Sequence, residues 1–182
     1  MKKIQHEQLK QILEAAVFVH ETPLSMETIK HTLLADYSVS SQAVNKAMNE
    51  LSLDYAPRGI NLVKVASGWR FQSEDSLGPI LSNLWQEPPP RYSRALLETL
   101  SLIAYRQPIT RGEIEDIRGV AVSSNIIKTL TEREWVSVVG HKEVPGRPAL
   151  YATTQQFLDY FSLESLADLP DSELFEQTGT VQ

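Results

Sequence analysis

The sequence contains no cysteine, which excludes a disulfide scaffold, thiolate catalysis and a cysteine-based metal site. This absence suits a reducing cytoplasm, where we expect the protein to be found. No apolar run approaches the roughly 18 residues that a membrane helix needs, so we predict no membrane segment. The first residues, MKKIQHE, lead into a charged amphipathic segment without an apolar core, so we also predict no secretory signal.

Signatures of catalysis are missing as well. The four histidines lack the spacing of a metal site, and the eight glycines are too scattered to form a phosphate-binding loop. Acids cluster at Glu113, Glu115 and Asp116, but the start of a helix attracts carboxylates through its dipole alone. We therefore predict that the protein is not an enzyme and has no catalytic residue, no metal site and no cofactor.

Charge is present but unevenly distributed. The 182 residues include 17 Lys plus Arg and 23 Asp plus Glu, for a formal net charge of −6. Residues 91–158 have nine basic and seven acidic side chains, whereas residues 159–182 have six acids and no base. We expect residues 167–182 to form an acidic, disordered tail. The acidic balance weakens any case for strong non-specific binding to nucleic acid.

Proline marks a boundary near the middle of the chain. Pro88-Pro89-Pro90 favours a short polyproline II spacer, so we predict a Pro-rich linker over residues 87–92. The two halves also resemble each other, because Pro23-Leu24-Ser25 matches Pro108-Ile109-Thr110 at a shift of 85 residues. A second match, at a shift of 83, agrees in order and spacing. The sequence therefore predicts a duplicated domain, with copies at residues 1–86 and 93–166.

The first copy has the pattern of three helices followed by a β-hairpin. An apolar stripe at helical spacing predicts the first helix, through Leu9, Ile12, Leu13, Ala16 and His20. Ser25 can cap the second helix, and Ser40 or Ser41 can cap the third. After these helices, the runs Ile60–Val65 and Trp69–Gln72 are β-prone and predict the hairpin.

The second copy repeats this order of elements. Ser93 can cap its first helix, and Ser123 or Ser124 can cap its third. Thr110 and Glu113 have the spacing of a capping box at the start of the second helix, which Gly119 ends.

Ile114 and Ile117 are expected to face inward from this second helix. Strands are predicted at residues 135–139 and 150–153, before a last helix capped by Thr153 or Thr154. Three helices and a hairpin form the winged-helix arrangement. The predicted fold class is therefore α+β, mainly α, with two tandem winged-helix domains.

Two long runs in the second half resemble the bacterial segregation and condensation protein B family. They are Ile103–Glu115 (IAYRQPITRGEIE) and Val144–Thr154 (VPGRPALYATT). Shorter stretches at Leu97–Leu100 and Ser165–Pro170 agree with the family as well. The first half of the chain matches by its pattern of elements rather than by a motif.

The resemblance implies a non-enzymatic subunit of the bacterial condensin complex, built from two winged-helix domains. That complex also contains an SMC ATPase and a kleisin, segregation and condensation protein A, and it compacts and segregates chromosomes during the cell cycle and cell division. The resemblance further implies a homodimer that pairs through its N-terminal domains. The C-terminal domains grip the central region of the kleisin, which connects them to the SMC ATPase. We accordingly expect a cytoplasmic, nucleoid-associated protein.

The resemblance also directs attention to candidate contacts with the kleisin. Its central region is a largely extended, often acidic chain, so binding it needs apolar grooves and positive charge. The candidate kleisin-binding residues, all in the second domain, are Arg106, Ile109, Arg111, Arg118 and Arg147. Arg111, Glu115 and Arg118 share one helical face, where a solvated set of ion pairs is the alternative explanation. For Arg147, bracing of the wing against the domain weighs equally with partner contact.

The alternative function is that of a winged-helix transcriptional regulator that binds DNA. Gln and Asn on a third helix can read adenine in the major groove. The polar faces in question are Gln42, Asn45, Lys46 and Asn49 in the first copy, and Asn125, Lys128, Thr129 and Arg133 in the second. Each face offers only one or two bases, with acids close by, whereas specific DNA binding usually engages several phosphates. We therefore expect any DNA contact to be weak or indirect.

Overall fold

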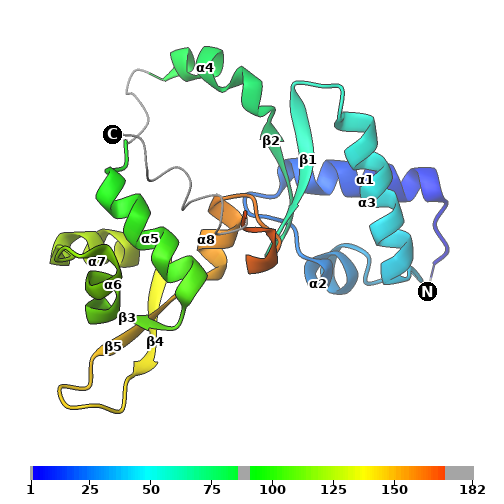
Figure 1. The fold of residues 1–182 in the computed structure, drawn as a ribbon. Coiled ribbons are helices and arrows are strands. Elements are labelled where there is room, and N and C mark those ends of the chain that lie inside the picture. The colour runs from blue at the N-terminus through cyan, green and yellow to red at the C-terminus, as the bar shows by residue number, and fades with distance from the viewer. Residues whose placement is uncertain (1, 86–90, 171–182) are drawn as a thin grey trace. The chain divides into compact units, whose positions relative to one another are not determined.

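The computed structural model describes residues 2–85 and 91–170 (Figure 1). The chain divides into two compact units, Met1–Pro89 and Pro90–Gln182, called here the first and second domains. The predicted class, mainly α with small sheets, is confirmed. Residues 87–90 of the predicted linker and residues 171–182 of the predicted tail lie outside the described residues. Within the described ranges, no helix is both long and apolar enough to cross a membrane.

The first domain follows the predicted order of three helices and a hairpin, and then adds a short helical segment. Its elements are α1 (His6–Val19), α2 (Met26–Thr28) with a π-helical turn (Ile29–Leu33), α3 (Ser41–Tyr55), β1 (Ile60–Val65), β2 (Gly68–Ser73) and α4 (Gly78–Leu81), the last lying between two 3-10 turns (Asp75–Leu77 and Ser82–Leu84). The predicted caps are confirmed, because the hydroxyls of Ser25 and Ser40 accept hydrogen bonds from backbone N–H groups three residues on.

An isolated β-bridge between Leu24 and Trp69 joins the segment before α2 to the hairpin of the first domain. The N–H of Leu24 donates to the carbonyl of Trp69 at 2.7 Å, and the N–H of Trp69 donates back at 3.0 Å. The segment before α2 thus pairs with β2. Gly68 permits this approach, because a Cβ at its position would lie 2.3 Å from the Leu24 carbonyl oxygen. Beneath the bridge, α1 and α3 bury their apolar stripes together, as the sequence pattern predicts.

The second domain repeats this plan with one additional short strand. Its elements are α5 (Arg94–Arg106), β3 (Ile109–Thr110), α6 (Arg111–Arg118), α7 (Ser124–Glu132), β4 (Val136–His141), β5 (Ala149–Thr153), α8 (Gln155–Tyr160) and a 3-10 turn (Leu166–Asp168). The strands form an antiparallel sheet in the order β3-β5-β4, with Ile109 opposite Tyr151. β3 was not predicted, although it occupies the place of the Leu24 bridge in the repeat.

Most of the helix ends of the second domain were predicted correctly. Ser93 and Ser123 cap α5 and α7, and Gly119 ends α6 in the left-handed conformation with φ 69°. The prediction that both isoleucines of α6 face inward is wrong, because Ile114 is fully buried while Ile117 is 55% exposed. Side chains three residues apart on an α-helix point about 60° away from each other. Ile114 lies on the buried face of α6, and this angle places Ile117 outside that face.

An aromatic cluster joins the two ends of the second domain. Trp135 is buried, and the rings of Tyr92 and Tyr160 lie 5.2 Å and 4.6 Å from it, centroid to centroid. The guanidinium of Arg133 lies 4.8 Å from the centre of the Tyr92 ring and 5.3 Å from that of Trp135. Arg133 therefore packs into this cluster, which removes it from the polar face suggested for DNA.

Candidate functional site

The second domain has an open hollow of about 320 Å³ where α5 ends and α6 begins. Its lining residues are Arg106, Pro108, Ile109, Glu113, Asp116 and Ile117. Ile109 is buried, whereas Pro108 and Ile117 are exposed, so the hollow has an apolar surface bordered by charged groups. Such a surface can accept an apolar side chain of a partner and orient it by the surrounding charges.

Gln107 fixes the backbone at the entrance of this hollow. Gln107 is extended, with φ −57° and ψ 147°, as is usual for a residue that precedes proline. Its side-chain Oε1 accepts hydrogen bonds from the N–H of Thr153, at 2.7 Å, and from the Thr153 hydroxyl, at 3.0 Å. Its Nε2 donates to the carbonyl of Ala104 at 3.1 Å. The end of α5 is thereby tied to β5, which holds Arg106 and Pro108 in place.

Glu113 connects the hollow to the hairpin formed by β4 and β5, called here the wing. The predicted capping box is confirmed: Thr110 Oγ1 accepts from the N–H of Glu113 at 3.3 Å, and Glu113 Oε2 accepts from the N–H of Thr110 at 2.8 Å. Lys142 Nζ of the wing donates to Glu113 Oε1 at 2.5 Å. The Lys142 hydrogen bond, followed by those from Thr110, lowers the pKa of Glu113 from 4.5 to about 2. Glu113 is thus a charged anchor for both α6 and the wing.

Arg111 lies at the first turn of α6 and is half-exposed. Its Nε donates to Glu115 Oε1 at 2.9 Å, and its Nη1 donates to Ser124 Oγ at 3.1 Å. Glu115 also accepts from the N–H of Val122 at 2.8 Å. The Val122 hydrogen bond and that from Arg111 lower the pKa of Glu115. Two hydrogen bonds therefore hold the Arg111 side chain in place, while part of that side chain remains exposed to solvent.

Arg118 forms its ion pair with α5 and not with Glu115, the partner of Arg111. Its side chain is 10% exposed and turns toward α5, where Nη2 donates to Glu98 Oε2 at 3.1 Å. Its Nη1 lies 3.4 Å from the hydroxyl of the buried Thr99. Glu98 and Thr99 on α5 provide the acceptors for Arg118. Glu115 already accepts hydrogen bonds from Arg111 and Val122. Arg118 thus joins α6 to α5, and Ile109 is 4% exposed where it lines the hollow, so both side chains are largely buried.

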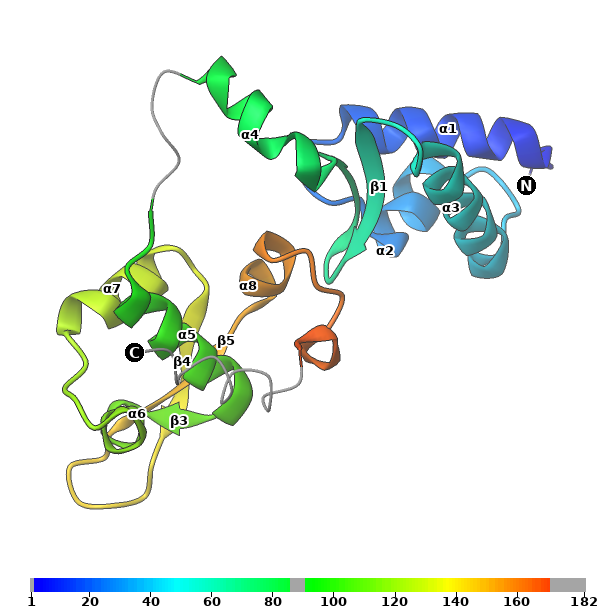
Figure 2. The same cartoon turned by 45° about the horizontal axis from the view of Figure 1, so that its top comes forward.

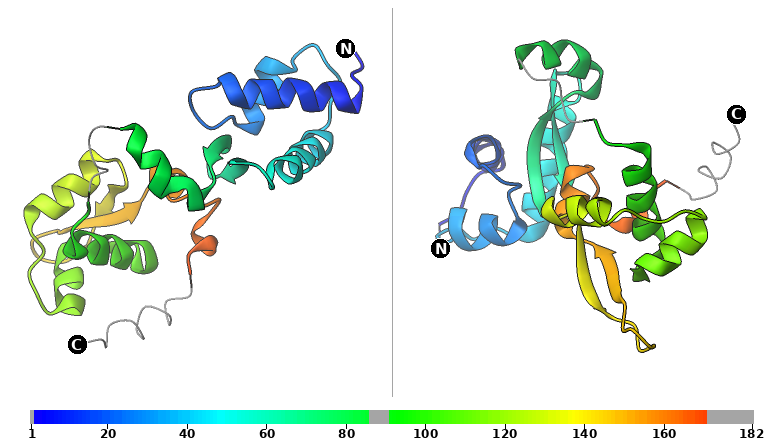
Figure 3. Two further views of the ribbon diagram at one scale, coloured as in Figure 1. Left: turned by 90° about the horizontal axis from the view of Figure 1, so that it is seen from above. Right: turned by 90° about the vertical axis from the view of Figure 1, so that its left-hand side faces the viewer.

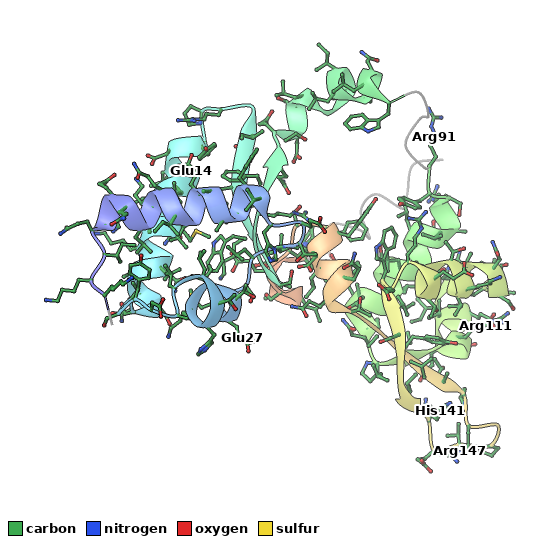
Figure 4. The ribbon with its side chains drawn as sticks, turned by 180° about the vertical axis from the view of Figure 1, so that it is seen from behind. Glu14, Glu27, Arg91, Arg111, His141 and Arg147 are labelled. Carbon is green, nitrogen blue, oxygen red and sulfur yellow. The ribbon has the colours of Figure 1, made fainter. Side chains whose placement is uncertain are left out.

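The other two arginine candidates are exposed. Arg106 is the last residue of α5, beside the hollow. Arg147 lies in the loop of the wing (Figure 4), with its backbone in the left-handed region at φ 39°. Its guanidinium makes a loose 3.8 Å ion pair with Glu143 of the same loop, and both side chains are largely exposed. Lys142, rather than Arg147, is the residue whose side chain links the wing to the body of the domain.

The outer edge of the wing is a further open surface. Figure 3 shows the wing extending from the body of the second domain, with β4 at the edge of its sheet. Among the described segments, β4 pairs only with β5. Its central residues, Val138 and Val139, are exposed, and no charge occurs between Val136 and Gly140. An uncharged, unpaired strand edge of this kind can accept an extended peptide.

No constellation for metal chemistry occurs in the part of the chain that the structure describes. Over residues 2–85 and 91–170, no three His, Asp or Glu side chains are grouped so that they could hold a metal ion.

Comparison with known proteins identifies the family. The family model described as "Segregation and condensation complex subunit ScpB" matches residues 11–172. The chain belongs to the segregation and condensation protein B family.

Members of this family resemble the chain over most of its length. The Coxiella burnetii segregation and condensation protein B homolog is 53% identical over 164 residues, covering 90% of this chain and 78% of that protein. The Myxococcus xanthus segregation and condensation protein B is 37% identical and covers 97% of this chain, which spans only 53% of that relative. Among solved structures, ScpB from Mycobacterium tuberculosis is 28% identical, with a TM-score of 0.41 and coverage of 89% of this chain and 99% of that one.

Membership of the segregation and condensation protein B family confirms the resemblance carried by the two motif runs of the second domain. It gives no support to the alternative of a transcriptional regulator. The motif runs contain all the residues that line the hollow except Asp116 and Ile117. Ile117 was missed as a surface residue because its spacing from Ile114 resembles that of a buried stripe. Lys142 was missed as the wing anchor, since only proximity in space pairs it with Glu113.

Proposed function

We propose that this chain is a non-enzymatic, dimeric adaptor of the bacterial SMC–kleisin condensin complex. Its first domain serves dimerisation, and its second binds the central region of the kleisin, segregation and condensation protein A, and through it the SMC ATPase. Both are winged-helix domains, and the adaptor acts in the cytoplasm at the nucleoid. The observation that carries the proposal is the family match over residues 11–172.

The surface of the second domain supports the kleisin contact. Arg106 borders an apolar hollow, and Arg111 and Arg147 offer positive charge on the same domain. An extended, acidic and partly apolar chain is complementary to such a surface. In this proposal, Arg106, Arg111 and Arg147 contact the kleisin directly. Ile109 and Arg118 act through the fold, because one forms the floor of the hollow and the other holds α6 against α5.

Light scattering on the purified chain, alone and with the central fragment of the kleisin, tests the proposal. We expect about 41 kDa for the chain alone, twice its mass of 20.5 kDa, and a further increase when the fragment is added. A monomer that binds the fragment would refute the dimer but keep the adaptor. A dimer without a mass increase, together with salt-sensitive binding to duplex DNA, would refute the adaptor.

A pair of matched charge reversals tests the role of the arginines. Arg111→Glu should weaken fragment binding by about tenfold or more, since it replaces an attractive charge by a repulsive one. Lys128→Glu is the control, because Lys128 is also exposed and also pairs with a glutamate four residues on. We expect Lys128→Glu to change fragment binding less than about twofold. Equal effects of the two variants would show that only the net charge of the domain matters.

A further inference from the structure

The first domain has a hollow of about 470 Å³ beside the start of α3, called here the first-domain hollow. All the residues that line it fall within residues 30–40, from the π-helical turn that follows α2 to the residue before α3. Its polar lining residues are Lys30, His31, Tyr37, Ser38 and Ser40. Small-molecule sites in proteins typically have volumes of about 300–1,000 Å³, so this hollow is large enough to hold a small ligand.

Two nitrogen-bearing side chains of the π-helical turn line the first-domain hollow. Ile29 anchors this turn, because it is fully buried and its carbonyl accepts from the N–H of Leu34 at 2.8 Å. Lys30 and His31 follow directly in the same turn. Over residues 2–85 and 91–170, neither of these two side chains forms a hydrogen bond or an ion pair. The ammonium of Lys30 and the imidazole of His31 are therefore free to donate to an external anion.

Hydroxyl groups on the loop before α3 add further donors. The Tyr37 ring packs against the core of the first domain, and its hydroxyl has no hydrogen-bond partner in the part of the chain that the structure describes. The same holds for the Ser38 hydroxyl within the described ranges. Ser40 Oγ accepts from the N–H of Ala43 at 3.1 Å, which leaves its hydroxyl hydrogen free to donate. The first-domain hollow thus gathers hydrogen-bond donors from two neighbouring segments.

Charge distinguishes the first-domain hollow from the other hollows of the molecule. The hollow of the second domain is lined by two carboxylates, and a third hollow, between α1 and α3, is lined by three. Glu27 of α2 and Asp36 of the loop lie close in the sequence but do not line the first-domain hollow. The carbonyl of Asp36 accepts from the N–H of Lys2 at 2.8 Å, which holds the basic pair Lys2 and Lys3 beside this loop (Figure 2). The local charge therefore favours an anion.

We propose that the first-domain hollow binds a small organic molecule through its phosphate group. The oxygens of a phosphate group accept hydrogen bonds from an ammonium, an imidazole and hydroxyls, which are the donors gathered here. Leu34, Ala35 and Val39 complete the lining and offer apolar surface to the organic part of the ligand. The donors are side chains, so the site differs from the loops that bind phosphate through backbone N–H groups.

A small ligand fits these observations better than the phosphate backbone of DNA. Binding of DNA usually engages several phosphates, whereas the first-domain hollow is a single cluster of donors. Residues 1–86 also contain more acidic than basic side chains, which opposes binding of a long polyanion. The inference goes beyond the proposed function, because phosphate binding requires neither the dimer nor the kleisin. Failure of either proposal would leave the other standing.

Titration of the full chain with inorganic phosphate, followed by NMR at about 150 mM salt, tests the proposal. We expect saturable shifts of the backbone amides of residues 30–40. Lys30→Gln/His31→Gln should raise the dissociation constant of phosphate by about tenfold or more, and His31→Gln alone by about threefold, because charge-assisted donors are lost. Arg58→Gln is the control, since Arg58 lies beyond the far end of α3, about 22 Å of helix away, and we expect less than about a twofold change. Shifts that do not saturate, or equal effects of the double variant and the control, would overturn the proposal.

Phenyl phosphate and a short DNA duplex identify the source of the phosphate group. Phenyl phosphate should bind at least about threefold more tightly than inorganic phosphate, because its ring can cover the apolar side chains of Ala35 and Val39. Val39→Thr should reduce this gain. Equal affinities for the two phosphates would overturn the organic ligand. A duplex that binds at the same residues more tightly than phenyl phosphate, with an affinity that falls steeply as salt rises, would assign the first-domain hollow to nucleic acid and also overturn the proposal.

Discussion

Glu113→Gln is a sharp test of how the second domain is held together. Gln retains the shape needed for the capping box but loses the charge that binds Lys142. The shift of the Glu113 pKa from 4.5 to about 2 corresponds, at about 1.4 kcal/mol per pKa unit, to an upper bound of about 3.4 kcal/mol. The side chain is 39% exposed, so solvent screening reduces the expected loss of unfolding free energy to about 1 kcal/mol.

The pH dependence of this loss follows from the direction of the pKa shift. The pKa of Glu113 is lower in the folded state, so its contribution is complete above the unfolded value of 4.5 and is lost as the pH falls toward 2. Urea unfolding followed by circular dichroism should show the full difference between wild type and variant at about pH 7 and less than half of it at about pH 3.

Glu132→Gln is the control for this experiment, because Glu132 is 63% exposed and its ion pair with Lys128 spans 3.6 Å. We expect it to change the unfolding free energy by less than about 0.3 kcal/mol at either pH. The reasoning would be refuted if Glu113→Gln had an equally small effect, or if its effect were the same at both pH values.

Two further substitutions test the packing of each domain. Gly68→Ala should destabilise the first domain by about 3 kcal/mol or prevent its folding, because the new Cβ would lie 2.3 Å from the Leu24 carbonyl oxygen and φ is 151°. Gly78→Ala, with no atom within 4 Å of its Cβ, should stay within about 0.5 kcal/mol of the wild type in the same thermal unfolding assay. Arg118→Met should cost the second domain about 1–2 kcal/mol in urea unfolding while leaving fragment affinity unchanged where the variant is folded. A stable Arg118→Met that fails to bind the fragment would instead show direct contact.

Local signals in the sequence were sufficient to predict most of the helix ends. Four helices are preceded by a residue whose hydroxyl accepts a hydrogen bond from a free backbone N–H group: Ser40, Ser93, Thr110 and Ser123. Gly119 ends α6 in the left-handed conformation, which glycine adopts most readily. Each of these devices acts within a few residues of chain. These helix ends can therefore be predicted from the sequence without knowledge of the tertiary structure.

Features that depend on contacts between distant residues were not predictable in this way. β3 has only two residues and exists because β5 pairs with it, and Arg118 faces Glu98 from a different helix. The helical segment of residues 75–84 was not predicted, because Gly78 and Pro79 interrupt its sequence like a turn. Pro79 nevertheless lies at the start of α4, where its missing N–H costs nothing. The candidate contact residues Arg106, Arg111 and Arg147 were named from family motifs, and their role stays a prediction.

The aromatic cluster around Trp135 determines how the second domain can be studied in isolation. Tyr92 stacks on Arg133, and its hydroxyl lies 3.1 Å from that of Tyr160. At the other end, Leu169 packs against the core and the Tyr105 hydroxyl donates to the carbonyl of Pro170. A fragment trimmed to residues 93–166 would lose the contacts made by Tyr92, Leu169 and Pro170, and would expose the side of Trp135 that Tyr92 covers. We therefore expect a fragment of this half to need residues 92–170, and shorter fragments to be less stable.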